Sequence, residues 1–167
     1  MSLLSFGRLI FSSEQEKNEA EKINFSMSGC HIRTEDEVCE VTHRVLDKLL
    51  SQDGLYFKAF ELSDGPKDNT AEYLFAPKYY GTGDLRGLPI VKILPLYERM
   101  ELVQKFFEQI FSLMKPTLIK LCICDEGYPI VSDCKIMEVS LSELAQKLYD
   151  EYDDYCGTPT LLITIKK

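Results

Sequence analysis

The sequence contains no tryptophan, only two histidines and no long hydrophobic run. Its charge-free stretches, such as residues 155–165, are far shorter than the roughly twenty apolar residues that cross a bilayer, so no membrane span is predicted. The N-terminal residues also lack a basic region followed by a long apolar region, the pattern of a secretory signal peptide. These features predict a cytoplasmic protein.

An excess of positive charge is absent as well. The chain has 19 lysines and arginines against 27 aspartates and glutamates, which gives a formal net charge of −8. An acidic surface repels phosphate groups, so neither a nucleic acid nor an anionic membrane is predicted as a partner. A basic protein is the kind of macromolecule that such a surface attracts.

The length of 167 residues, with 45% apolar and 28% charged residues, fits one folded domain. The chain has six cysteines, and in a protein of this size without a secretory leader they are expected to be buried thiols rather than disulfides. Cys122 and Cys124 lie two residues apart on a predicted strand, and core packing is expected for them rather than metal binding.

The hydrophobic periodicity switches between two and 3.6 residues in an ordered way. It predicts strands at 23–32, 55–62, 89–94 and 118–124, with helices at 34–53 and 96–115. This order is that of a ferredoxin-like βαββαβ core, about 23–124, in a two-layer α+β sandwich. A hairpin with a strand within 130–139, a third helix after the Ser140–Glu143 capping box, and a strand at 160–166 extend it. Residues 1–167 then form one domain, with 1–22 as a peripheral strand and linker.

A catalytic or metal site would need imidazoles, and only His31 and His43 are available. Cys39, His43 and Asp47 recur every four residues on the first predicted helix, the order of an activated thiol. That stripe lies on the flank of the apolar face and leaves little room for a substrate. Cys30 and His31 are adjacent on a strand and point to opposite faces, which does not suit zinc. No catalytic residue, metal or cofactor is therefore predicted.

Carboxylates crowd the end of the third predicted helix, at Asp150, Glu151, Asp153 and Asp154. A helix C-terminus carries partial negative charge, so exposed acids there cost about 0.3–1 kcal/mol each. They serve either solubility or the binding of something cationic. Tyr79 and Tyr80, in the irregular stretch 63–88, would add contact area. The leading hypothesis is a non-enzymatic interaction protein that binds a basic macromolecular partner through these residues, in an inhibitor or immunity-type role.

The alternative hypothesis is a small-molecule-binding domain or enzyme whose pocket lies between the sheet and the 63–88 loop. His43, Tyr80, Asp84 and Arg86 would be its pocket residues. A homodimer joined through an exposed edge strand is compatible with both hypotheses, and the closing strand 160–166 is a candidate edge.

Overall fold

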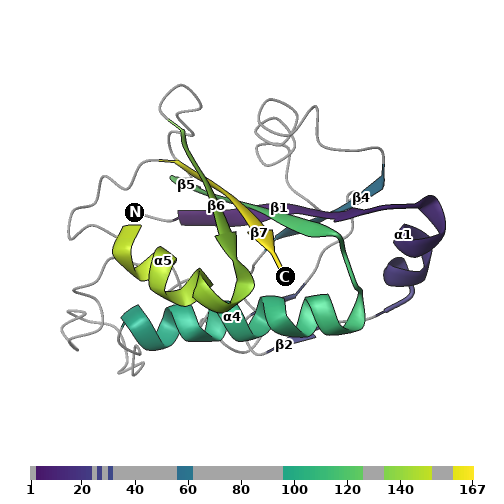
Figure 1. The fold of residues 1–167 in the computed structure, drawn as a ribbon, viewed down its shortest axis with the longest axis horizontal. Coiled ribbons are helices and arrows are strands. Elements are labelled where there is room, and N and C mark those ends of the chain that lie inside the picture. Colours follow the sequence, from purple (N-terminus) through teal and green to yellow (C-terminus); the bar gives the residue numbers. More distant parts are fainter. Residues whose placement is uncertain are drawn as a thin grey trace, which may run out of the picture.

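The protein is a mixed α/β structure built on a five-stranded sheet (Figure 1). The computed structural model describes residues 3–23, 26–27, 30–31, 56–61, 96–125, 134–151 and 160–167. In chain order, the strands of the sheet are β1 (Leu3–Phe11), β4 (Tyr56–Glu61), β5 (Leu118–Asp125), β6 (Lys135–Ser140) and β7 (Leu161–Lys166). Two short strands, β2 (Ser26–Met27) and β3 (Cys30–His31), pair with each other in a separate two-stranded sheet.

The strands of the main sheet lie in the order β4-β1-β5-β7-β6. All neighbours are antiparallel except β6 and β7, which are parallel. Two expectations about the ends of the chain are corrected by this order. The closing strand, β7, is internal and not an edge, and β1 has a partner on each side and is not peripheral. Apolar pairs such as Leu121 opposite Ile163 explain why β7 is internal, since both faces of an internal strand are covered.

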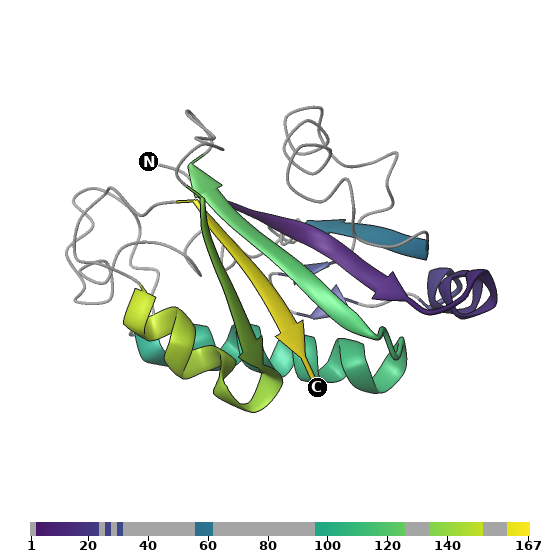
Figure 2. The ribbon, with the colours of Figure 1, turned by 45° about the horizontal axis from the view of Figure 1, so that its top comes forward.

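Helices α4 (Leu96–Leu113) and α5 (Leu144–Glu151) cover one face of this sheet (Figure 2). Apolar residues recur on α4 at helical spacing, and its buried residues form a stripe along one side. They are Leu96, Arg99, Met100, Val103, Phe106, Phe107, Ile110 and Phe111. Lys115, with a φ of 53°, and Pro116 end the helix where the pattern predicts its end. A short 3-10 turn, η3 (Leu141–Glu143), leads into α5.

Helix α1 (Glu14–Glu21) follows β1 directly, in a segment expected to be a marginal helix or linker. Its start is well capped. The Ser13 Oγ accepts a hydrogen bond from the Glu16 N–H at 3.2 Å, and the Glu16 carboxylate accepts one from the Ser12 N–H at 3.3 Å. The first bond satisfies a backbone donor that the first turn of a helix leaves unpaired, and the second ties the residue before the N-cap to that turn. Together they help to explain how so polar a segment is helical.

The main core lies between the sheet and helices α4 and α5. Its bulkiest buried side chains are phenylalanines. The Phe107 ring makes edge-to-face contacts with Phe60 of β4 and Phe106, with ring centroids 5.7 and 5.3 Å apart. Such contacts between buried rings add to the free energy gained by burial itself.

A second, smaller cluster lies on the opposite face of the sheet and contains Phe6, Ala59, Cys122, Cys124 and Leu162, with Cys134 packed against it. The Arg8 guanidinium, on the same face, lies over the Phe57 ring at 4.0 Å from its centroid. Both faces of the sheet therefore bury apolar side chains.

The structure confirms the broad sequence prediction of one mixed α and β unit. Strands β4 and β5, helix α4 and strand β7 lie where the periodicity predicts them. The ferredoxin-like core stays a prediction, because most of 32–55 and 62–95 lies outside the described residues. In the described part, β4 and β5 both flank β1, a strand which that core does not include. No helix in the described ranges is both long and apolar enough to pass through a membrane.

Candidate functional site

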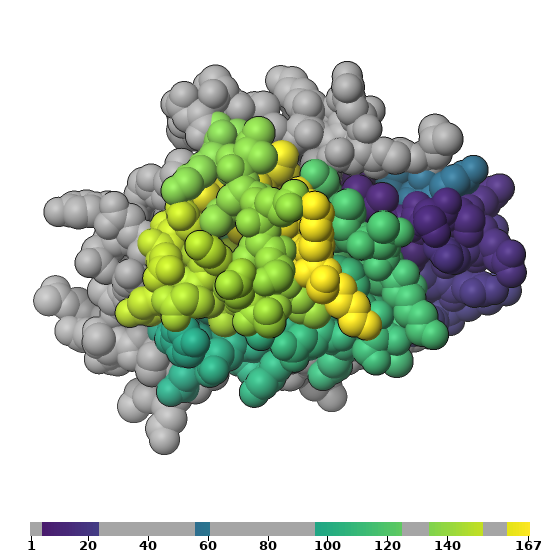
Figure 3. Space-filling model, in the orientation of Figure 1, coloured from purple at the N-terminus to yellow at the C-terminus, as the bar shows by residue number. Residues whose placement is uncertain are grey.

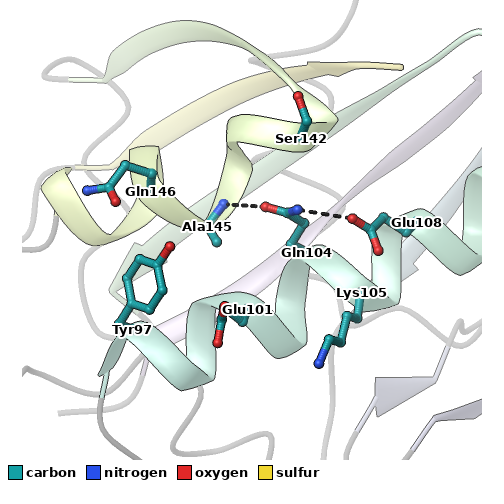
Figure 4. A pocket seen from close by; sticks show the side chains of 8 residues that line it. All are labelled: Tyr97, Glu101, Gln104, Lys105, Glu108, Ser142, Ala145 and Gln146. Carbon is teal, nitrogen blue, oxygen red and sulfur yellow. Dashed lines mark hydrogen bonds between the residues drawn. The ribbon is translucent and has the colours of Figure 1, made fainter.

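A shallow groove of about 160 Å³ runs between the exposed sides of α4 and the η3–α5 segment (Figure 4). The two helices are antiparallel, because Gln104 of α4 reaches the start of α5 while Tyr97 reaches Tyr149 near its end. Polar side chains dominate the walls. The lining residues are Tyr97, Glu101, Gln104, Lys105, Glu108, Ser142, Ala145 and Gln146.

Gln104 holds the two helices together at the floor of the groove. Its Oε1 accepts a hydrogen bond from the Ala145 N–H at 2.9 Å, and its Nε2 donates to Glu108 Oε1 at 3.0 Å. The Ala145 N–H belongs to the first turn of α5, where backbone donors have no partner within the helix. The glutamine therefore acts as a cap supplied by a neighbouring helix and fixes the spacing of the groove walls.

The predicted capping box at the start of this segment forms in a different way. Ser140 occupies the N-cap position of η3, but its hydroxyl makes no bond to the backbone there. It donates instead to the Glu143 carboxylate at 2.9 Å. The pattern thus marks the correct start, while the backbone N–H of Ala145 is satisfied by Gln104 from another helix.

The charge of the groove is negative. Glu101 and Glu108 lie on its α4 wall with Lys105 between them. Asp150 lies one turn beyond Gln146, whose Nε2 donates to its carboxylate at 2.8 Å. In the part of the chain that the structure describes, no lysine or arginine forms an ion pair with these three carboxylates. Within the described residues, their negative charge is thus not neutralised.

An aromatic pair lies at one end of the groove. The Tyr97 and Tyr149 rings are edge-to-face, with centroids 5.5 Å apart. Tyr97 is 40% exposed, so one ring is held by its neighbour and still faces solvent. A pre-ordered tyrosine offers contact area at a small entropic cost, and its face attracts cations.

The structure divides the predicted acidic cluster. Asp150 is exposed, whereas the Glu151 carboxylate is paired with the Lys135 ammonium of β6 and is thus neutralised within the molecule. Asp153 and Asp154 lie outside the described residues. Of these two acids, only Asp150 has no ion pair within the described residues, and it lies one turn beyond Gln146, which lines the groove. The groove also contains Glu101 and Glu108 of α4, which the sequence prediction did not include.

The other predicted site residues lie outside the described ranges, and their arrangement stays untested. They are Tyr79 and Tyr80 of the contact surface, and His43, Asp84 and Arg86 of the alternative pocket. The groove between α4 and α5 is open and polar, unlike the apolar pocket that a small-molecule site would need. Among the described residues, no group of three histidine, cysteine or carboxylate side chains is arranged to hold a metal ion.

Three thiols gather on the sheet face opposite the helices. Cys122 and Cys124 are buried, and Cys134 is half-buried. A hydrogen bond with Cys124, and then burial, raise the pKa of the Cys122 thiol far above its usual range. Burial, followed by the nearby Cys124, raises the pKa of Cys134. Cys122 and Cys134 therefore stay protonated and unreactive near neutral pH.

The raised pKa of Cys122 predicts an alkaline loss of stability. The unfolded chain releases this proton near pH 8.5, whereas the folded chain retains it. The stabilisation is thus fully present below that pH and is lost as pH rises, by up to about 1.4 kcal/mol per pH unit. We expect the urea-unfolding free energy of wild type to fall more steeply above pH 8.5 than that of Cys122→Ala. Equal slopes for the two proteins would contradict the assignment.

Comparison with known proteins gives no relative. No protein-family model matches the chain, and neither a curated protein nor a solved structure resembles it significantly.

Proposed function

We propose that this chain is a non-enzymatic interaction protein that binds a basic segment of a partner protein along the groove between α4 and α5. The observation that carries the proposal is that three carboxylates on two helices held in register, Glu101, Glu108 and Asp150, have no ion pair with a described lysine or arginine. The net charge of −8 supports the same kind of partner.

The groove suits a lysine or arginine side chain more than a neutral ligand. Carboxylates on both helices would accept hydrogen bonds from a guanidinium or ammonium group. The exposed ring of Tyr97 at the end of the groove would stack on such a group or on its aliphatic stem. Gln104 keeps the walls at a fixed spacing, so binding would cost little conformational entropy in the groove.

Long-range attraction would raise the association rate, and salt would weaken it. Exposed charges are screened over about 8 Å at physiological ionic strength, so a partner held mainly by these acids dissociates as salt increases. Each exposed pair contributes about 0.2–1 kcal/mol, so three acids together account for roughly a tenfold change in affinity.

Affinity capture with matched variants tests the proposal. The groove variant carries Glu101→Gln, Glu108→Gln and Asp150→Asn, and the control variant carries Glu14→Gln, Glu19→Gln and Glu21→Gln on α1. Both remove the same charge, and both retain side-chain oxygens that accept hydrogen bonds. The bound proteins are quantified by mass spectrometry at low and high salt.

We expect wild type and the α1 variant to capture the same lysine- and arginine-rich protein in a salt-sensitive way. The groove variant should recover about tenfold less of it. Equal losses in the two variants would mean that net charge alone matters, and undiminished capture by the groove variant would reject this surface.

A further inference from the structure

Strand β6 forms one edge of the described sheet, since only β7 pairs with it there. The space-filling view shows β6 and α5 at the surface of the molecule on this side (Figure 3). An accessible edge strand presents backbone N–H and C=O groups that can pair with another strand.

The hydrogen-bond register identifies which residues of β6 present those groups. The Lys135 N–H donates to the Thr160 carbonyl oxygen at 2.8 Å, so Lys135 bonds toward β7. In a parallel ladder, alternate residues bond to the same neighbour. Ile136 and Glu138 therefore direct their N–H and C=O groups away from β7.

These two outward residues are also the most exposed of the strand. The Ile136 side chain is 74% exposed, and the Glu138 side chain is 63% exposed. A single exposed isoleucine is ordinary on a protein surface. Ile136, however, has both an exposed apolar side chain and backbone N–H and C=O groups that point away from β7. An added strand could bond to those backbone groups and pack against that side chain.

The charges that usually protect an edge are neutralised within the molecule. The Lys135 ammonium is paired with Glu151, and the Lys166 ammonium is paired with Glu138 at 2.8 Å. The edge of β6 is thus locally neutral in a chain whose net charge is −8. Two copies of this chain would repel each other over most of their surfaces, and this edge is a place where they would not.

We propose that β6 pairs antiparallel with β6 of a second copy of this chain, about a two-fold axis at Ile136. A two-fold perpendicular to the sheet places residues of the same face opposite each other. With outward residues facing outward residues, Ile136 lies opposite its own counterpart, and Lys135 lies opposite Met137. The pairing joins the five described strands of each copy into one continuous sheet.

A second copy of this chain is the partner that suits this edge, because the edge is complementary to itself. The register places the two exposed isoleucines against each other, and cross-strand β-branched pairs stabilise sheets. The pairing is short, and interfaces of small area are weak, so the dimer is expected to be concentration-dependent. This inference does not rest on the proposed function, since a groove on the helices is not needed for strand pairing.

Sedimentation of the full chain over a dilution series tests the proposal. Ile136→Lys places two ammonium groups together at the axis, and Ile136→Pro removes an outward N–H without removing a bond to β7. Leu113→Lys is the matched control, because Leu113 is 50% exposed on α4, away from β6. Circular dichroism establishes that each variant is folded.

We expect wild type and Leu113→Lys to dimerise alike. Ile136→Lys should weaken the dimer by about tenfold or more, and Ile136→Pro should do the same. A wild-type chain that is monomeric throughout would overturn the proposal. So would a dimer that survives Ile136→Lys, or one that Leu113→Lys weakens equally.

A covalent trap keeps the test independent of variants that fail to fold. Hydrogen-bonded antiparallel pairs have Cα atoms about 5.5 Å apart, within the range of a disulfide. Ile136→Cys in oxidised glutathione should therefore give a dimer whose peptide map links position 136 to position 136, and Leu113→Cys should not link through position 113. A cross-link from position 136 to another protein's strand, or none, would contradict pairing between copies.

Discussion

Substituting Gly7→Ala is expected to destabilise the native state by about 3 kcal/mol or more. A Cβ at this position would lie 1.8 Å from the carbonyl oxygen of Lys120 and 2.8 Å from Cζ of Phe60. Gly7 lies in β1 between two paired strands, opposite Leu121 of β5 and Phe60 of β4. The closer contact is with backbone of the central sheet, which cannot move aside without breaking its hydrogen bonds.

Urea unfolding measures this loss, and two variants locate its cause. Ser5→Ala, on the same strand and the same face, should change the free energy of unfolding by less than about 1 kcal/mol. Truncating the ring with Phe60→Leu should not rescue Gly7→Ala, because the Lys120 carbonyl remains. A Gly7→Ala protein as stable as wild type would show that β1 does not approach β5 in this way.

The second large effect is expected from Phe107→Ala, which should cost about 3–5 kcal/mol. Phe107 is fully buried under the sheet and makes edge-to-face contacts with Phe60 and Phe106. Its removal leaves a cavity that these rigid rings do not fill. Since domains of this size are stable by about 5–15 kcal/mol, a large part of the total would be lost.

Leu113→Ala on the same helix is the matched control for Phe107→Ala. Leu113 is 50% exposed, so its truncation should change the unfolding free energy by less than about 0.5 kcal/mol. If both substitutions cost the same, α4 would not pack its Phe107 side against the sheet.

The sequence predicts the helices and strands of this fold better than it predicts which of them lie next to each other. Helix α4 and strand β5 follow from hydrophobic period alone, because each buries one pattern of side chains against the core. Period carries no information about which strands pair. Strand β1 was expected at the periphery, because the predicted βαββαβ core, about 23–124, does not include it. In the structure Gly7 allows the close approach of β5, and Arg8 is buried over the Phe57 ring.

The sequence of helix α1 contains a helix-start signal that the prediction did not use. Ser13 and Glu16 have the spacing of a capping box, and their side chains cap the first turn. The polar composition of the segment nevertheless favoured a linker, because an isolated short helix of this kind is marginal in water. Packing of Ala20 into the core supplies the stabilisation that propensity alone does not show.

The candidate site was predicted only at one end. Asp150 followed from the unfavourable placement of acids at a helix C-terminus, and it does lie beside the groove. The acids of α4 were missed because carboxylates on the polar side of an amphipathic helix are ordinary. Tyr97, Glu101, Lys105 and Glu108 share that side at spacings of four or three residues, but only the packing of α5 against it creates a groove.

Mapping amide chemical shifts while a polyarginine peptide is titrated tests most directly whether the α4–α5 groove binds basic segments. The account predicts saturable shifts concentrated at Tyr97, Glu101, Glu108, Gln146 and Asp150, diminished in the groove variant and retained in the α1 variant. Shifts that spread over α1 and the acidic surface at large, or that never saturate, would contradict it.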